Sequence, residues 1–242
     1  MRIVVAAVLA MLLGSITSSH VHAQQIRIAS INHQTPRLAV TQSIMSQIYQ
    51  RLGHTMTIVN YPAKRSLIEV SSGAVNGELA RASLVEARYP NLIRIPYAIG
   101  TIKLVTIQLK NTPPIQQLTD LKNRRVGILR GYAMTEKMSE HLTREIYNDL
   151  SGLFQGLIHG RVDVVFFSRL AAEHYIRKLN LEAKLAISEK SFIEIPLYHY
   201  LHYSSANIAQ ALTAEMKKMH TAGELQTLIS TQEQRFMETN DQ

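Results

Sequence analysis

Polar side chains follow several segments that are predicted to be β-strands, and their types fit the recognition of a small charged solute. Ligands of open α/β sheets bind in the crevice beyond the carboxyl ends of the strands. The charged residues at such places are Glu78 and Arg81, and a guanidinium fork matches the bidentate geometry of a carboxylate. The other candidates at strand ends, or in the loops after them, are His33, Tyr61, Tyr132 and Ser168.

Glu78 and Arg81 stand three residues apart near the end of a predicted strand, residues 75–80. On an extended strand their side chains would face opposite ways, because successive side chains alternate between the two faces. If the strand ends by Leu79, both side chains can point into a cleft. Two interpretations stay open, a structural salt bridge between the two residues and direct contact with a ligand.

Other chemistries have little support in the sequence. His199 and His202 are three residues apart on a predicted strand, which places them on opposite faces and argues against a shared metal ion. The chain has no HExxH, P-loop, nucleophile-elbow or dinucleotide-binding glycine pattern. We therefore expect no catalytic residue, no cofactor and no metal.

A short pattern that occurs twice indicates how these residues are positioned. Residues 73–76 (GAVN) and 160–163 (GRVD) share the form Gly-x-Val-(Asn/Asp), and each copy follows an amphipathic run. A glycine just past a helix can adopt the left-handed conformation that closes the last turn. The apolar residues that follow then begin a buried strand. Two such helix–strand joints predict two similar lobes with a cleft between them, although this joint is also common in other α/β proteins.

The remaining periodicity predicts alternating strands and helices, the pattern of an open, mostly parallel sheet. Two long extended segments, 99–109 and 195–203, are interpreted as crossings between the lobes. One lobe is then discontinuous and comprises residues 24–108 and 199–242, whereas residues 109–198 form the other. The predicted strands are 26–31, 55–59, 75–80, 92–95, 125–129, 162–167 and 184–187, and the predicted helices are 36–52, 62–72, 83–89, 115–121, 135–147, 150–158, 169–179, 206–220 and 222–236.

The N-terminus has the form of a secretory signal peptide, residues 1–23. Arg2 precedes an uncharged apolar run, and Val21 and Ala23 fit the cleavage site. The chain contains no cysteine, so we expect neither a disulfide nor a lipid anchor on cysteine. These features predict an exported, unanchored protein of the bacterial periplasm with no membrane insertion, and we expect a monomer.

Composition is consistent with this interpretation. The 242 residues include 46% hydrophobic ones, enough for an ordinary core, and the formal net charge is +8. A basic balance can indicate nucleic-acid binding, but the lysines and arginines are scattered along the chain. We therefore expect no nucleic-acid partner.

Several motifs, taken in order, resemble the family 3 extracellular solute-binding proteins. Residues 62–78, 118–131 and 160–163 are similar to the family's segments "P-x-x-R-x-L…sGxvDg", "sl-DLkGkkVGv-G" and "G-R-V-D", and the likeness covers nearly all of the chain after residue 23. The resemblance implies the type II periplasmic-binding-protein fold, in which each lobe is an open sheet flanked by helices and two strands form the hinge. It also implies service to ABC importers of amino acids and other small polar ligands.

The resemblance also implies roles for particular residues. Arg88 matches the arginine that grips the ligand carboxylate, although a solvent-exposed arginine paired with Glu86 is an equal alternative. Residues 131–134 match the backbone amides that meet a carboxylate, and Tyr132 could either stack on a ligand or cover the hinge. Ser168 stands where amino-acid binders usually carry an aspartate that pairs with the ammonium group. This departure argues against a plain α-amino acid as the ligand.

The sequence therefore predicts a periplasmic protein that binds a small polar, carboxylate-bearing solute by hinge closure. The partner would be a membrane ABC permease or a sensor. One alternative is a dehydratase-like enzyme on the same scaffold, with Glu78 as general acid. Another is a partner-binding accessory protein with a degenerate cleft.

Overall fold

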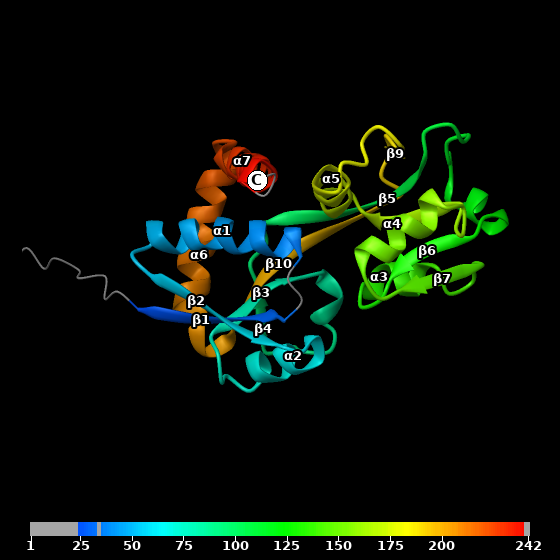
Figure 1. Cartoon of the computed structure of the whole chain (residues 1–242). Helices are drawn as coiled ribbons and strands as arrows, with labels where there is room; N and C mark the ends of the chain where they lie inside the picture. Colours follow the sequence, from blue (N-terminus) through cyan, green and yellow to red (C-terminus); the bar gives the residue numbers. More distant parts are fainter. Residues whose placement is uncertain (1–23, 33–34, 240–242) are drawn as a thin grey trace, which may run out of the picture.

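The computed structural model describes residues 24–32 and 35–239 and folds into two α/β lobes (Figure 1). The predicted signal peptide and His33 lie outside these residues. Ten strands form one curled mixed sheet in the order β2-β1-β3-β10-β5-β8-β6-β7, with β4 paired to β10 and β9 paired to β5. The described residues contain no helix that is both long and apolar enough to cross a membrane.

The first lobe, on the left in Figure 1, holds four strands of the sheet and four α-helices. Its strands β1 and β2 pair in parallel, as do β1 and β3. The elements are β1 (Gln25–Ile31), α1 (Pro36–Arg51), β2 (Thr55–Tyr61), α2 (Ala63–Ser71), β3 (Gly77–Arg81), η1 (Ser83–Val85), β4 (Leu92–Arg94), η3 (Tyr203–Ser205), α6 (Ala206–Thr221) and α7 (Glu224–Thr239).

The second lobe repeats this plan on a smaller scale. Its strand β6 pairs in parallel with β7 and with β8. The elements are η2 (Leu118–Asn123), β6 (Val126–Leu129), α3 (Ala133–Met138), β7 (Arg144–Tyr147), α4 (Leu150–Ile158), β8 (Val164–Ser168), α5 (Arg169–Lys178) and β9 (Leu185–Ile187).

Two long strands, β5 (Gly100–Leu109) and β10 (Ile193–His202), join the lobes (Figure 1). They pair antiparallel with each other from Gly100–Leu197 to Leu104–Ile193. Beyond this ladder β5 continues beside β8 and β9, whereas β10 continues beside β3 and β4. The two-strand hinge is therefore confirmed. The lobe boundaries at residues 108/109 and 198/199 stay a prediction.

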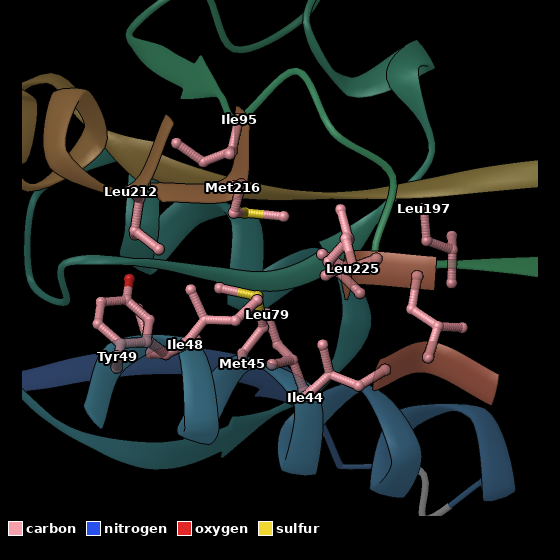
Figure 2. Close-up of a cluster of buried hydrophobic side chains, with 14 of the residues drawn as sticks. Ile44, Met45, Ile48, Tyr49, Leu79, Ile95, Leu197, Leu212, Met216 and Leu225 are labelled. Carbon is pink, nitrogen blue, oxygen red and sulfur yellow. The ribbon is translucent and has the colours of Figure 1, made fainter. Parts of the chain in front are cut away.

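Helix α1 supplies the core face of the first lobe. Thr35 caps it, because its hydroxyl accepts a hydrogen bond from the N–H of Leu38 (3.3 Å), and Pro36 occupies the first turn. Ile44, Ile48 and Tyr49 recur at helical spacing and are fully buried. Figure 2 shows them facing side chains of β3 and α6, so this core unites segments from both ends of the chain.

The two repeated joints have the same structure. Gly73 and Gly160 both have positive φ, +77° and +67°, as expected for residues that close a helix. Each following Asn or Asp then makes a pair of hydrogen bonds with an arginine at the start of a neighbouring strand, the third residue of β1 or the residue just before β6. Asn76 pairs with Arg27 (Oδ1···H–N 2.9 Å, N–H···O 2.8 Å), and Asp163 pairs with Arg125 (2.8 Å and 2.8 Å). The motif thus has a structural role that is identical in the two lobes.

The predicted helix 135–147 is wrong. Helix α3 ends at Met138, and residues 144–147 form strand β7, which pairs with β6 along its full length. The hydroxyl of Ser139 donates to the carbonyl of Thr135 and helps to end the helix (2.7 Å). The apolar residues at helical spacing still pack on one core, namely Met134, Met138, Leu142 and Ile146. Their spacing therefore indicated correctly that they face a core, but it did not indicate the right secondary structure. The predicted helix 115–121 is a 3-10 helix, Leu118–Asn123.

Candidate functional site

A cleft of about 340 Å³ lies between the lobes, beside the two joining strands. It is lined by residues at the ends of β1, β3 and β8, by the first turns of α1 and α3, and by β5 and β10. The side chains on its wall are mostly apolar. The lining residues are Ile31, Thr35, Pro36, Arg37, Leu38, Ala63, Ala80, Arg81, Ala82, Ile102, Leu104, Gly131, Tyr132, Met134, Thr135, Ser168, Ala171, Ile195 and Leu197.

An irregularity in β3 brings Glu78 and Arg81 to the same side of the sheet. Tyr198 of β10 pairs with Arg81, but Tyr200 pairs with Glu78, so β3 holds one more residue than β10 in this interval. Such a bulge shifts the alternation of side chains by one position. Glu78 and Arg81 can therefore meet without the early strand end that the sequence would require.

Glu78 and Arg81 form a buried ion pair. The Glu78 side chain is 1% exposed, and its Oε1 lies 3.1 Å from Nη2 of Arg81, while the hydroxyl of Ser66 donates to its Oε2. Burial raises the pKa of Glu78 to about 7, and the neighbouring Arg81 and Ser66 oppose this shift. Glu78 does not line the cleft. It stands behind Arg81 and holds that side chain in place.

Arg81 is the charged residue of β3 that reaches the cleft. Its side chain is 15% exposed, and Nη2 also donates to the carbonyl of Ala63 (3.3 Å). Its Nε is buried and has no hydrogen-bond partner among the described residues. A guanidinium that is anchored at one nitrogen and has a further N–H without a partner can bind an anionic group.

A buried hydrogen-bond chain supports the bulge from the other face. The carbonyl of Leu79 can only accept, so Nδ1 of His199 carries the proton at this contact (3.1 Å). Nε2 of His199 then accepts from the hydroxyl of Tyr49 (2.8 Å). Complete burial lowers the pKa of His199 to about 4, so the ring is neutral at ordinary pH.

The second lobe contributes Ser168 and Tyr132. Ser168 is the last residue of β8 and directly precedes α5, as Arg81 is the last residue of β3. The ring of Tyr132 packs against Phe167 with centroids 4.8 Å apart, and burial, with a smaller effect of Tyr175, raises its pKa to about 12. Both residues line the cleft. Their contact with a ligand stays a prediction.

The backbone amides expected to meet a ligand carboxylate are partly engaged. The N–H of Gly131 donates to Oε1 of Glu136 (2.7 Å), and the N–H of Tyr132 points to the carbonyl of Leu129 (3.4 Å). This arrangement leaves Arg81 as the stronger candidate for a carboxylate.

Besides Glu78, two more of the predicted residues, Arg88 and Tyr61, do not line this cleft. Arg88 is exposed, and its guanidinium lies 5.9 Å from the ring centroid of Tyr89. Its proposed partner Glu86 instead pairs with Arg94 (2.9 Å). Tyr61 is half-buried against the core beneath β1 and β2.

Sequence reasoning missed Arg37, which lines the cleft from the first turn of α1. Its side chain is 11% exposed, and Nη1 lies 2.5 Å from Oε1 of Glu233 in α7. The sequence did carry a signal for Arg37, because Thr35 and Pro36 mark the start of a helix directly after β1 and Arg37 is the next residue. The pairing with Glu233, which neutralises the charge, is a long-range contact that no local pattern reports.

No group of three or more histidine, aspartate or glutamate side chains is positioned to hold a metal ion in the part of the chain that the structure describes. The only ionisable side chains on the cleft wall among these residues are Arg37, Arg81 and Tyr132.

Comparison with known proteins identifies the fold. No protein-family model matches the chain. An uncharacterized protein of Shewanella oneidensis is 23% identical over 186 residues, which cover 74% of this chain and 70% of that protein. The L-cystine-binding protein TcyJ of Escherichia coli K12 is 26% identical over 136 residues, 55% of this chain, and the match spans 50% of the length of TcyJ.

Solved structures cover more of the chain. The GluR0 ligand-binding core in complex with L-glutamate matches with a TM-score of 0.69 at 15% identity and covers 89% of this chain and 99% of its own. A histidine kinase sensor domain with similarity to periplasmic binding proteins matches with a TM-score of 0.65 at 15% identity, over 86% of this chain and 95% of its own. The chain therefore has the two-lobed, periplasmic-binding-protein-like fold that its motifs predicted.

Proposed function

We propose that this protein binds a small carboxylate-bearing solute in the cleft and that the lobes close around it. Hinge closure is an established response of two-lobed proteins to a ligand. The observation that carries the proposal is Arg81, a guanidinium at the cleft wall that is held from behind by Glu78 and keeps unused donors. The two joining strands beside the cleft supply the place about which the lobes can rotate.

We further propose export to the periplasm as a monomer and delivery of the solute to an ABC permease or a sensor. TcyJ is named for L-cystine binding, and a histidine kinase sensor domain shares the fold, so relatives of both kinds support this role. The predicted signal peptide supports export.

The dehydratase-like alternative has less support. A general acid must reach the proton that it transfers, directly or through one water. Glu78 is 1% exposed, and both of its oxygens are engaged by Arg81 and Ser66. We therefore propose a binding protein and not an enzyme.

The test is a thermal-shift screen with a broad panel of small carboxylates and amino acids, because a ligand that binds only the folded state raises the melting temperature. The affinity of each hit is then measured by calorimetry for the wild type and for Arg81→Lys, which keeps the positive charge but loses the bidentate guanidinium. We expect roughly a tenfold or greater loss of affinity. Arg88→Lys is the matched control and should bind like the wild type. Equal affinity for wild type and Arg81→Lys would refute Arg81 as the anion grip.

A further inference from the structure

The described residues that line the cleft include cationic and apolar side chains but no anionic one. Among the described residues that line it there is no aspartate or glutamate, and most of the wall is aliphatic. The large aliphatic side chains come from the first lobe and the two joining strands, and the second lobe adds the apolar side chains of Met134 and Ala171. The largest are Ile31, Leu38, Ile102, Leu104, Ile195 and Leu197.

The glutamates beside the cleft already have partners: Glu78 and Glu233 pair with arginines, and Glu136 accepts a hydrogen bond from the N–H of Gly131. Glu78 lies behind Arg81 and does not line the cavity, and Glu233 pairs with Arg37 at 2.5 Å. Residues 33 and 34, next to the cleft in the sequence, are a histidine and a glutamine and supply no carboxylate. A ligand ammonium group would therefore lose its water and meet only neutral acceptors among the described residues that line the cavity.

Neutral acceptors do not compensate a desolvated ammonium group. The side-chain acceptors of the lining residues are the hydroxyl oxygens of Thr35, Tyr132, Thr135 and Ser168, and all of them are neutral. Taking a cation out of water without a counter-charge is strongly unfavourable. The cleft thus selects against amino groups.

The charge balance limits the number of carboxylates as well. Each of the two cleft arginines has a glutamate partner, so the site gains at most one net positive charge, when Glu78 is protonated. A second carboxylate would find no free counter-charge. The volume, about 340 Å³, is at the lower end of the range for small-molecule sites and fits a compact ligand.

We infer that the ligand is a compact monocarboxylate with an apolar body and no ammonium group, such as a branched-chain 2-oxo acid or a short unsubstituted acid. This inference rests on the proposed function, because it specifies the ligand of the same cleft. The carboxylate meets Arg81, and the hydrocarbon part packs between the aliphatic walls of the two lobes.

A matched series tests the inference. Calorimetric titration of the purified protein at pH 7 compares 4-methylpentanoate, 4-methyl-2-oxopentanoate and L-leucine, which share one carbon skeleton. We expect both acids to bind and L-leucine to bind roughly tenfold or more weakly, because only its ammonium group differs in charge. Lengthening the acid by one methylene should raise affinity by about fourfold, until the cavity is full.

Reciprocal variants sharpen this test. Ser168→Asp supplies the missing carboxylate and should shift the preference toward L-leucine, whereas the neutral control Ser168→Asn should not. Aspartate and asparagine are both good N-cap residues, so α5 should keep its start in either variant. Equal or tighter binding of L-leucine to the wild type would overturn the inference and leave the proposed function standing. If none of the three ligands binds, this ligand class is wrong. If they bind equally well to Arg81→Lys, Arg81 is not the anion grip, and the observation that carries the proposed function is lost.

Discussion

The buried carboxyl of Glu78 predicts a specific dependence of stability on pH. The pKa of Glu78 is raised from 4.5 to about 7, so between these values the folded state holds a proton that the unfolded state has lost. The free energy of unfolding then falls with rising pH by about 1.4 kcal/mol per pH unit. Over an interval of about 2.5 pH units, the contribution of Glu78 decreases by about 3 kcal/mol. It is fully present below pH 4.5 and lost above about pH 7.

Glu78→Gln removes this titration and keeps the size of the side chain. His199 acts in the opposite direction, because its lowered pKa of about 4 makes stability rise with pH up to its usual value of 6.5. The two effects partly cancel in the wild type, so the informative quantity is the difference between wild type and Glu78→Gln, in which His199 drops out.

The assay is urea denaturation of both proteins at pH values from 4.5 to 8. We expect the unfolding free energy of wild type minus that of Glu78→Gln to fall by about 3 kcal/mol across this range. Glu182→Gln, at an exposed glutamate, should give a flat difference curve. A difference for Glu78→Gln that stays constant within about 0.5 kcal/mol would refute the burial argument.

Three further outcomes follow from the same contacts. Carboxylate affinity should fall by up to about tenfold per pH unit above pH 7, because ionised Glu78 competes for the cleft arginine, and calorimetry with Glu78→Gln should show no such trend. Tyr49→Phe leaves Nε2 of His199 without its donor and should lower the unfolding free energy by about 1–3 kcal/mol in urea titrations; an unchanged value would exclude this bond as a stabiliser. A Cβ on Gly77 would stand 2.3 Å from a carbonyl oxygen of β10, so Gly77→Ala should abolish folded protein as judged by circular dichroism. The control Gly160→Ala has open space around the new Cβ and should lower the unfolding free energy by only about 1 kcal/mol.

Features with local causes were predictable from the sequence. The start of α1 at Thr35–Pro36 and the joints at Gly73 and Gly160 depend on the conformational preferences of a few adjacent residues, and the structure agrees with them. The motifs also occur in the same order as in the solute-binding family, and this order led from the local features to the prediction of a two-lobed fold. The fold class and the two joining strands followed from it, whereas the roles of Arg81 and Ser168 in binding stay a prediction.

Features that depend on distant partners were not predictable. Residues 144–147 look helical by spacing but form a strand, because the free edge of β6 is available to them. The shared face of Glu78 and Arg81 depends on Tyr198 and Tyr200, more than one hundred residues away, which fix the bulge. The resemblance matched Arg88 to the carboxylate-gripping arginine of the family, but a match of sequence motifs cannot reveal that the chain leaves the cleft soon after β3.

In each lobe the joint and one cleft-lining residue lie at opposite ends of one strand region, five residues apart. In the first lobe Asn76 precedes β3 and Arg81 ends it, and in the second Asp163 precedes β8 and Ser168 ends it. The hydrogen bonds of the joint thus lie at the other end of the strand from the side chains that we propose select the ligand. Selectivity can consequently drift during evolution, or be retargeted in the laboratory, by exchanges at positions 81 and 168 that leave these hydrogen bonds untouched.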